Sequence, residues 1–457
     1  MSNVLNEFKK NLFDAGIVDM NPDNNGAIIW LPNGMIIRNI FIESVRESCL
    51  EHSFEEFLFP TMVSGKEFRT MSENIFDFSN NVYYVDEDKV LRPSGESIIY
   101  PQFRRWIKSY KDLPIRAFQI GTSFRKLTPR SVFRIKEQDL FVEGHTAHTT
   151  AREAEEQFCQ NIELIRAVLE FLGLPTIYTY RPVWGNKPVS NKTAGIDTLL
   201  PNGETILAGC AYLQNQIFSK PFNIQFTNQN NQKDFTYQTE FGLSAKTIFA
   251  SLFITSDSKG LNILPEIAPI QVIILPVVND DAYDEVFVYA TQVKDILMKS
   301  GVRCKIDTSE KSIGKKQYQY EKNGVPVRIV IGEKELQSNE VCLYSREEGS
   351  KTYAPIKSVV TSVKGMLEIS SDLIRKRIST KHFGDIIEIF SINEETNKQI
   401  TNGKVVKYPL CFNPECCQWA EKRIKGEIIG YEDFSTENNC VVCNSKTKTI
   451  AYHARRM

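Results

Sequence analysis

The chain lacks the features that mark membrane, secreted and low-complexity proteins. No apolar run among its 457 residues approaches the roughly 20 residues that cross a bilayer. Its first residues, MSNVLNEFKKNLFDAG, are polar and mixed in charge, which argues against a secretory signal. No internal repeat or low-complexity tract occurs. We therefore expect no membrane partner and a cytoplasmic location.

Net charge is almost absent as well. Lys and Arg total 55 and Asp and Glu total 56, which leaves a formal net charge of -1. The total charge by itself therefore gives no indication of a nucleic-acid partner. It does not exclude one, because a local basic face is what contacts phosphates.

What is present fits a globular protein of several domains. Apolar residues make up 42% and charged residues 24% of the chain, and 457 residues suffice for two or three full cores. The ten cysteines are expected to be free thiols or metal ligands, because disulfides are rare in a reducing cytosol.

Four of the cysteines form two short-spaced pairs near the C-terminus. Cys411 and Cys416 give C-x4-C, and Cys440 and Cys443 give C-x2-C. Four thiolates at such spacings suit a tetrahedral zinc ion. The alternative is a set of scattered free thiols, but half of all cysteines fall after residue 410. We predict zinc, in a structural role, because four protein ligands leave no open position for a substrate.

Residues 91–148 suit the recognition of a small zwitterion beside a polyphosphate. Glu96 is a carboxylate that can hold an ammonium or imino group, and Arg125 is a planar cation that can bridge a carboxylate and a phosphate. Apolar runs over 118–124 and 140–142 predict a hairpin that places cations over a nucleotide. The loop between the runs carries further basic residues, among them Lys126, Arg130 and Arg134.

These residues fall into two motifs. Arg92-Pro93-Ser94-Gly95-Glu96 resembles the RPTSE motif of prolyl-tRNA synthetases of the archaeal and eukaryotic type. The stretch from Ser123-Phe124-Arg125 to Glu143-Gly144-His145-Thr146-Ala147-His148 resembles motif 2 of class II aminoacyl-tRNA synthetases. The two motifs at this distance resemble the prolyl family closely, and the resemblance runs over nearly the whole chain.

The resemblance implies a multidomain protein of α/β and α+β class. Residues 1–265 are expected to form a class II synthetase catalytic domain on an antiparallel sheet, 266–375 an α/β anticodon-binding domain, and 376–457 a small C-terminal zinc-binding domain. From residue 270 onward, alternating strands and helices independently predict a small doubly wound α/β domain. A helix over 35–52 and a strand over 54–59 resemble motif 1, which implies a homodimer; the alternative is a core helix.

Local periodicity predicts the other elements. Helices are expected over 1–20, 98–110, 150–174, 282–300 and 356–371. Strands are expected over 26–31, 207–218 (ending as a helix), 222–226, 234–237, 270–277, 302–307, 325–331 and 341–345. Residues 240–253 resemble motif 3, a strand, turn and helix. Residues 62–86 and 187–198 are expected to be connections.

In the family, the amino-acid carboxylate attacks the α-phosphate of ATP, and the acyl group then passes to tRNA. The resemblance implies that Arg125 is the catalytic residue, binding both carboxylate and phosphate. It implies an amino-acid pocket of Ser94, Glu96, Arg125, Phe141, Glu143, His145 and Tyr212. It implies an ATP site of Arg125, Arg134, Cys210 and Lys246. The implied cofactors are ATP with Mg²⁺ and structural Zn²⁺, and the implied partners are tRNA and an amino acid, most simply proline.

Several positions depart from the family pattern. Leu127 replaces a glutamate, Gln138 or Asp139 replaces the phenylalanine that stacks on adenine, and Leu207 replaces an ATP-contacting glutamine. In the amino-acid pocket, Phe141 replaces a tryptophan, Cys210 a threonine and Tyr212 a histidine. Lys246 replaces the motif 3 arginine and keeps the charge without the planar fork.

These departures leave three hypotheses. The first is a working but divergent prolyl-tRNA synthetase. The second is a paralogue that activates another amino or imino acid, which the altered pocket residues favour. The third is a non-catalytic tRNA-binding protein, which Leu127, Leu207 and Lys246 favour. We prefer synthetase chemistry because its central residues remain: Glu96, Arg125, Glu143 and His145.

Overall fold

The structure is a computed structural model that describes residues 2–20, 27–77, 79–129, 131–182, 189–277 and 283–457. Parts of six sequence-based predictions lie outside these residues: Met1, Gly26, Phe78, Arg130, 187–188 and Ala282. The chain forms two compact units. The first comprises Met1–Asp19, Ile29–Phe41 and Ser251–Lys381, and the second comprises Met20–Ile28, Ile42–Ala250 and His382–Met457. No helix in the described part of the chain is long and apolar enough to span a membrane.

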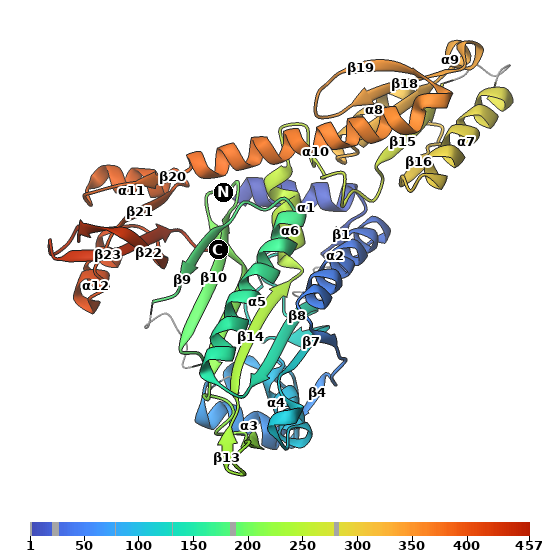
Figure 1. The fold of residues 1–457 in the computed structure, drawn as a ribbon. Helices are drawn as coiled ribbons and strands as arrows, with labels where there is room; N and C mark the ends of the chain where they lie inside the picture. The colour runs from blue at the N-terminus through green and yellow to red at the C-terminus, as the bar shows by residue number, and fades with distance from the viewer. Residues whose placement is uncertain (1, 21–26, 78, 130, 183–188, 278–282) are drawn as a thin grey trace. The chain divides into compact units, whose positions relative to one another are not determined.

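The second unit is built on a long sheet, which Figure 1 shows with its central strands running side by side. Within the described residues this sheet has 11 strands in the order β20-β21-β23-β22-β9-β10-β11-β14-β8-β7-β3. Its centre is antiparallel. The central strands are β7 (Ile115–Phe124), β8 (Glu137–His148), β9 (Ile177–Tyr180), β10 (Lys192–Leu199), β11 (Thr205–Asn215) and β14 (Tyr237–Ser244).

Strands β7 and β8 form the predicted hairpin. Their register runs from Ile115 opposite Ala147 to Phe124 opposite Glu137. The short β3 (Glu55–Glu56) pairs in parallel with β7, so the strand predicted over 54–59 is present but reduced to two residues. The hairpin projects the connecting loop from the end of the sheet.

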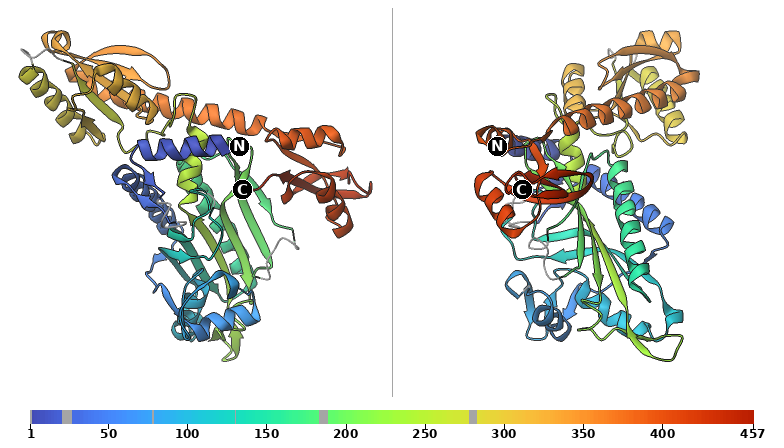
Figure 2. Two further views of the ribbon diagram at one scale, coloured as in Figure 1. Left: turned by 180° about the vertical axis from the view of Figure 1, so that it is seen from behind. Right: turned by 60° about the vertical axis from the view of Figure 1, so that its left-hand side comes forward.

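Helix α5 (Ala151–Phe171) covers one face of the sheet centre, as Figures 1 and 2 show. Thr150 caps it by accepting a hydrogen bond from the Glu153 amide. Its apolar residues recur at helical spacing and pack on β11, β14 and β8. The Asn161 amide donates to Thr239 at 2.9 Å. Because side chains alternate along a strand, Glu240 and its even-numbered neighbours point to the opposite face.

Three sequence-based predictions are wrong in this unit. Residues 192–199 form strand β10 rather than a connection, because they are almost all buried between β9 and β11. No helix follows β11, since Asn215 and Asn223 take left-handed conformations and the chain turns repeatedly between them. Residues 62–86 are no plain connection: they contain β4 (Met62–Ser64), α3 (Gly65–Asn74) and β5 (Tyr83–Asp86).

A second layer of core supports these segments. Helix α4 (Glu96–Trp106) confirms the helix predicted over 98–110, and it packs with α3 and β6 (Lys89–Leu91) around Tyr100 and Phe103. The paired strands β12 (Gln225–Thr227) and β13 (Lys233–Phe235) match the predicted sheet edges at 222–226 and 234–237 within a few residues.

The C-terminal residues extend the same sheet instead of standing apart. They form β20 (Ile386–Glu388), α11 (Glu394–Thr401), β21 (Val405–Pro409), α12 (Pro414–Arg423), β22 (Glu427–Asn439) and β23 (Lys446–Ala454). Strand β22 meets β9 at Tyr431 and Tyr180. The last residues return to β11: the Thr205 amide donates to the Arg455 carbonyl at 2.7 Å, and the Met457 amide donates to the Thr205 carbonyl at 3.1 Å.

The first unit is a mixed sheet with helices. Strands β15 (Val272–Pro276), β16 (Cys304–Ile306) and β17 (Val327–Ile331) are parallel, whereas β18 (Glu340–Ser345) and β19 (Lys351–Pro355) are antiparallel. The predicted alternation is confirmed, but the sheet is not purely parallel. The helices are α1 (Ser2–Asp14), α7 (Tyr283–Lys299), α8 (Ile313–Lys322), α9 (Glu333–Ser338) and α10 (Val359–Gly384). The short strands β1 (Val18–Asp19) and β2 (Ile29–Trp30) pair with each other in this unit. Helices α2 (Pro32–Glu51) and α6 (Lys246–Thr255) each have residues in both units.

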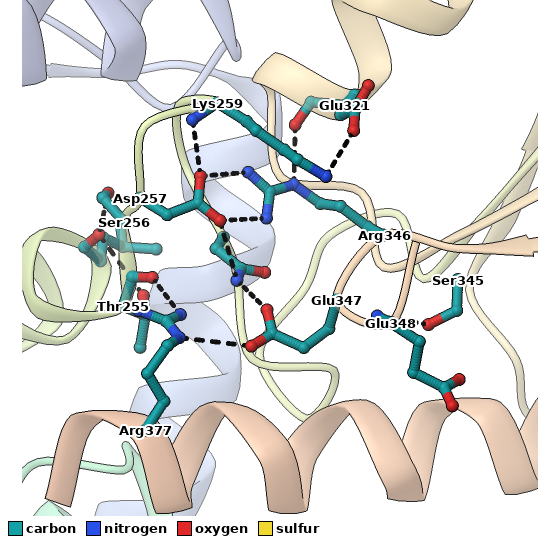
Figure 3. A network of polar contacts seen from close by, with 12 residues as sticks. Thr255, Ser256, Asp257, Lys259, Glu321, Ser345, Arg346, Glu347, Glu348 and Arg377 are labelled. Carbon is teal, nitrogen blue, oxygen red and sulfur yellow. Dashed lines mark hydrogen bonds and ion pairs between the residues drawn. The ribbon is translucent and has the colours of Figure 1, made fainter. Parts of the chain in front are cut away.

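A buried ion pair holds the loop after α6 to the end of β18 (Figure 3). Arg346, whose side chain is 2% exposed, donates to the two carboxylate oxygens of Asp257 at 2.8 and 2.9 Å. Burial alone would raise the pKa of Asp257, but the paired guanidinium outweighs it and holds that pKa below its usual value. Arg377 of α10 adds contacts to Glu347 at 3.2 Å and to the Thr255 carbonyl at 2.9 Å. The network therefore fixes three segments that are distant in sequence.

The three lysines at and just before the start of α8 do not form one exposed cluster. Lys311, Lys315 and Lys316 are candidates from the sequence for contacts to anticodon-stem phosphates. Lys316 is buried and donates to the Asp307 carbonyl at 3.2 Å. This residue therefore serves the structure of the unit, whereas Lys311 and Lys315 remain exposed.

We predict that His148 makes stability depend on pH. Its ring is 2% exposed, and burial, aided by Arg116, lowers its pKa from 6.5 to about 4. A folded-state pKa below the unfolded one means that the unfolded chain takes up the proton first as pH falls. Stability should therefore drop between pH 6.5 and 4, by at most roughly 3 kcal/mol at about 1.36 kcal/mol per pH unit.

Urea unfolding between pH 4 and 7.5 tests this contribution. The His148→Gln variant should show a shallower pH dependence than the native chain, whatever its absolute stability. His52→Gln, at a partly exposed histidine, serves as the matched control. Identical slopes for the native chain and His148→Gln would contradict the prediction.

Candidate active site

A cavity of about 180 Å³ opens on the sheet face opposite α5. Strands β8, β11 and β14 form its floor, and the start of α4 forms one wall. The structure brings most of the predicted site residues together in its lining: Ser94, Glu96, Arg125, Phe141, Cys210, Tyr212 and Lys246. Glu240 also lines it and was not among the predicted residues.

A second cavity of about 220 Å³ adjoins the first under the hairpin loop. Arg125, Gln138, Ser244 and Lys246 line both cavities. Arg134 lines only the second, together with the apolar stretch Val132, Phe133 and Ile135. The predicted ATP residues are therefore divided: Cys210 belongs to the first cavity, Arg134 to the second, and Arg125 and Lys246 to both.

Arg125 is held at this junction by its backbone surroundings. Its Nε donates to the Pro93 carbonyl at 2.9 Å, and its guanidinium lies over the Phe141 ring at 5.2 Å from the centroid. The first contact and the ring stacking fix the plane of the cation. Its remaining N–H groups can serve ligands in the two cavities.

Glu143 and His145 lie beneath the first cavity. Glu143 accepts from the Gly95 amide and from the Gln119 side chain, both at 2.8 Å. Burial alone would raise the pKa of Glu143, but His145, Arg92 and the Gly95 amide outweigh it and hold that pKa below its usual value. This anion therefore braces the loop that carries Ser94 and Glu96.

A chain of buried polar contacts runs from this floor to Glu240. His145 Nε2 lies 3.5 Å from Glu143, and its Nδ1 lies 3.1 Å from the Tyr100 hydroxyl. The Tyr100 hydroxyl donates to the side-chain oxygen of Gln214, and the side-chain nitrogen of Gln214 donates to Glu240 at 2.6 Å. Glu240 lies directly between His145 and Tyr212 in the antiparallel register, a placement that the sequence alone does not show.

Glu143, His145 and Glu240 also have ligand atoms within 4.8 Å of one another, as a metal site would require. However, both oxygens of Glu143 already accept hydrogen bonds. We therefore interpret the three residues as part of a hydrogen-bond network rather than as a metal site.

Arg92 supports the floor from below. It is buried, with Nε donating to the Thr122 carbonyl at 2.8 Å and Nη1 to Gln119 at 2.7 Å. A Cβ at Gly121 would lie 2.1 Å from its Nη2, so only glycine leaves room for this guanidinium. Arg92 therefore positions Gln119, which in turn contacts Glu143.

Two acceptors at the cavity wall have no protein partner. Ser94 and Glu96 are 5% and 7% exposed, and Ser94 Oγ and Glu96 Oε2 make no hydrogen bond within the described residues. A buried polar atom without a partner costs free energy unless a ligand or water completes it. These two atoms therefore mark the position of a ligand with hydrogen-bond donors.

The far wall of the cavity, which Cys210, Tyr212 and Lys246 line, differs in charge from the wall that carries Ser94 and Glu96. Burial lowers the pKa of Lys246, and burial raises the pKa of the Cys210 thiol, so this thiol stays protonated. Neighbouring Cys210, together with burial, raises the pKa of Tyr212 well above its usual value. The wall thus presents neutral hydrogen-bonding groups beside one cation.

The four predicted zinc ligands lie together at the far end of the sheet. The sulfur atoms of Cys411, Cys416, Cys440 and Cys443 are all within 4.8 Å of one another, and Cys411 Sγ lies 3.7 Å from Cys443 Sγ. Four sulfurs at about 2.3 Å from a tetrahedral zinc are about 3.8 Å apart, so the cluster fits this ion. Cys417 is buried and does not belong to the group.

Two family models match the chain. One is described as the tRNA synthetase class II core domain (G, H, P, S and T) and matches residues 78–254. The other is described as the anticodon binding domain and matches residues 271–366. Together they confirm the fold class predicted from the motifs.

Full-length relatives are similar over nearly the whole chain. Proline--tRNA ligase from Methanopyrus kandleri is 32% identical over 97% of this chain and 93% of its own length. The same enzyme from Methanosarcina mazei is 31% identical over 97% of this chain and 95% of its own length.

Solved structures agree with these sequences. Giardia lamblia prolyl-tRNA synthetase in complex with prolyl-adenylate has a TM-score of 0.94 at 25% identity, over 100% of this chain and 98% of that one. The Cryptosporidium parvum enzyme complexed with halofuginone and AMPPNP has the same fold, with a TM-score of 0.91 at 24% identity over 98% of this chain and 97% of that one. The chain described here therefore belongs to the prolyl-tRNA synthetase family.

Proposed function

We propose that this protein activates proline with ATP and transfers it to tRNA. One observation carries the proposal: Arg125 lies where the two cavities meet and lines both. A planar cation at such a junction can grip a carboxylate on one side and a phosphate on the other. Proline occupies the first cavity and ATP the second.

The imino acid is held by groups that lack protein partners. Its protonated ring nitrogen carries two N–H donors, which Ser94 Oγ and Glu96 Oε2 accept. Its carboxylate then lies at Arg125. Glu143 and His145 do not line the cavity, so they position the wall and floor rather than contact the substrate.

The chemistry needs no covalent nucleophile from the protein. A carboxylate oxygen of proline bonds to the α-phosphorus of ATP, and the bond from that phosphorus to pyrophosphate breaks. A ribose hydroxyl of tRNA then attacks the acyl carbon, and AMP leaves. The protein contributes position and charge neutralisation, mainly through Arg125, Arg134 and Lys246.

ATP enters as its magnesium complex, in which the ion neutralises phosphate charge. The missing motif 2 phenylalanine leaves Gln138 in the lining shared by the two cavities. Phe133 lines the second cavity as well, so it offers an aromatic surface for the adenine.

Replacing Arg125 by lysine should reduce activation strongly. Lysine keeps the charge but cannot pair with carboxylate and phosphate at once, so proline-dependent exchange of pyrophosphate into ATP should fall by roughly 100-fold. Arg152→Lys, the same change at an exposed site on α5, is the control and should leave exchange unaltered. Exchange by Arg125→Lys within threefold of native would refute the role of Arg125.

We also propose that the four-cysteine cluster holds one structural zinc ion. Cys411, Cys416, Cys440 and Cys443 would supply all four ligands, and the ion would tie the α12 segment to the hairpin of β22 and β23. It supplies folding energy and takes no part in the reaction.

Elemental analysis by mass spectrometry should find about one zinc per native chain. Cys443→Ser should lose most of it and lower the melting temperature, since three thiolates bind zinc far less tightly. Cys159→Ser, at an exposed cysteine outside the cluster, should keep its zinc. Retention of stoichiometric zinc by Cys443→Ser would show that the cluster is not the site.

A homodimer is the third proposal. Leu50 at the end of α2 and Leu58 after β3 are 64% and 84% exposed, and we propose that these large apolar side chains lie at the dimer contact. We expect light scattering to give a dimer mass for the native chain and a monomer mass for Leu58→Glu. Val288→Glu, at an exposed apolar site on α7, is the control. A dimer mass for Leu58→Glu would place the interface elsewhere.

The remaining assignments follow from family membership. We propose that tRNA binds through the α/β part at 266–375, that 1–265 carries the reaction, and that 376–457 is the zinc-binding part. We also propose a cytoplasmic location. It is supported by the ten cysteines, none of which forms a disulfide in the described residues, since unpaired cysteines persist in reducing compartments.

A further inference from the structure

The amino-acid cavity contains a carboxyl group that proline does not need. Glu240 lies half-buried in the middle of the floor, between Tyr212 on β11 and His145 on β8. One of its oxygens accepts from Gln214 at 2.6 Å. The residue lines the cavity, so a ligand there can reach its side chain.

The donors and acceptors of proline are already matched without it. In the proposed binding mode, the two N–H groups of the ring nitrogen donate to Ser94 Oγ and Glu96 Oε2, which are buried and have no protein partner. The carboxylate is neutralised by Arg125. The rest of proline is a ring of C–H groups, which cannot hydrogen-bond. A carboxyl group pressed against them would pay a desolvation penalty without a partner.

The surroundings of Glu240 favour its neutral form. Burial, and then the nearby carboxylates Glu96 and Glu143, raise its pKa well above the usual range, while Arg125 acts in the opposite direction. A protonated carboxyl both donates and accepts hydrogen bonds. A hydroxyl group also donates and accepts hydrogen bonds, so it is a matching partner for a protonated carboxyl group.

We infer that Glu240 recognises a hydroxyl group on the substrate ring, so that the cavity favours a hydroxylated imino acid over plain proline. This inference rests on the proposed function, since it concerns the substrate of the same site. The Gln214 side chain donates to Glu240, and backbone pairing with Tyr212 on β11 fixes its place in the floor. A site built to hydrogen-bond a hydroxyl discriminates against an analogue that lacks it.

Pyrophosphate exchange with matched substrates tests the inference. The substrates are L-proline, the two 4-hydroxy-L-prolines, 3-hydroxy-L-proline and thiazolidine-4-carboxylate, a ring of similar size without a hydroxyl group. The native chain should show a higher kcat/KM for at least one hydroxylated ring than for proline. We define the preference ratio as kcat/KM for that hydroxylated ring divided by kcat/KM for proline. In Glu240→Ala this ratio should fall by about tenfold or more, chiefly through loss of activity on the hydroxylated substrate.

Two controls separate recognition from general damage. Glu163→Ala, at an exposed glutamate on α5, should keep the native ratio. Glu240→Gln, which still donates and accepts, should retain more of the ratio than Glu240→Ala. A ratio that stays within twofold of native in Glu240→Ala, or a native preference for proline over every hydroxylated ring, would overturn the inference.

Thermal-shift titration with the same imino acids, in the presence of a non-hydrolysable ATP analogue, gives a readout independent of catalysis. If no amino acid supports exchange but the hydroxylated ring still stabilises the native chain more than proline does, and Glu240→Ala abolishes that difference, the proposed activity fails and the inference stands. If proline supports exchange and neither assay shows a difference at Glu240, the activity stands and the inference fails.

Discussion

The antiparallel register of β8, β14 and β11 is the constraint on which the site depends. It places Glu143 opposite Gly242, His145 opposite Glu240, and Glu240 opposite Tyr212, all on the face away from α5. A slip of one residue in β14 would turn Glu240 toward the helix and put Phe241 in the cavity. The helix prevents such a slip, because its buried face is matched to Thr239 and its odd-numbered neighbours on β14.

The two glutamates Glu143 and Glu240 differ in pKa according to how deep they lie at the cavity. Glu143 is an anion at the floor because its oxygens are bonded to the Gly95 amide and Gln119, with Arg92 and His145 close by. Glu240 lies nearer the opening, and burial together with the nearby carboxylates Glu96 and Glu143 raises its pKa well above the usual range, which favours its neutral form. Two residues of the same type in one pocket thus have pKa values shifted in opposite directions, because their neighbours differ.

The sequence revealed this site to different degrees. Arg125, Glu96 and the cysteine pairs were predictable, because each lies in a short motif whose spacing reflects one local structure. Strand β10 was missed, since a central strand buried on both faces loses the polar alternation that identifies a strand. Glu240 was missed because its role depends on two other strands that are distant in the chain. The joining of β22 to β9 was unpredictable for the same reason: the two strands are distant in the chain and have one paired position, Tyr431 opposite Tyr180.

That contact has a consequence for synthesis. The edge beside β9 and the start of β11 receive their partners from residues about 250 positions later, as the bond from Thr205 to Arg455 illustrates. At roughly 5–20 residues per second, a ribosome takes about 10 to 50 s to make that length of chain. Through this interval the nascent catalytic sheet has an unpaired edge, which other chains can join. Translational speed through the second half of the message, and the chaperones present during it, therefore bear on how much of this protein reaches its native state.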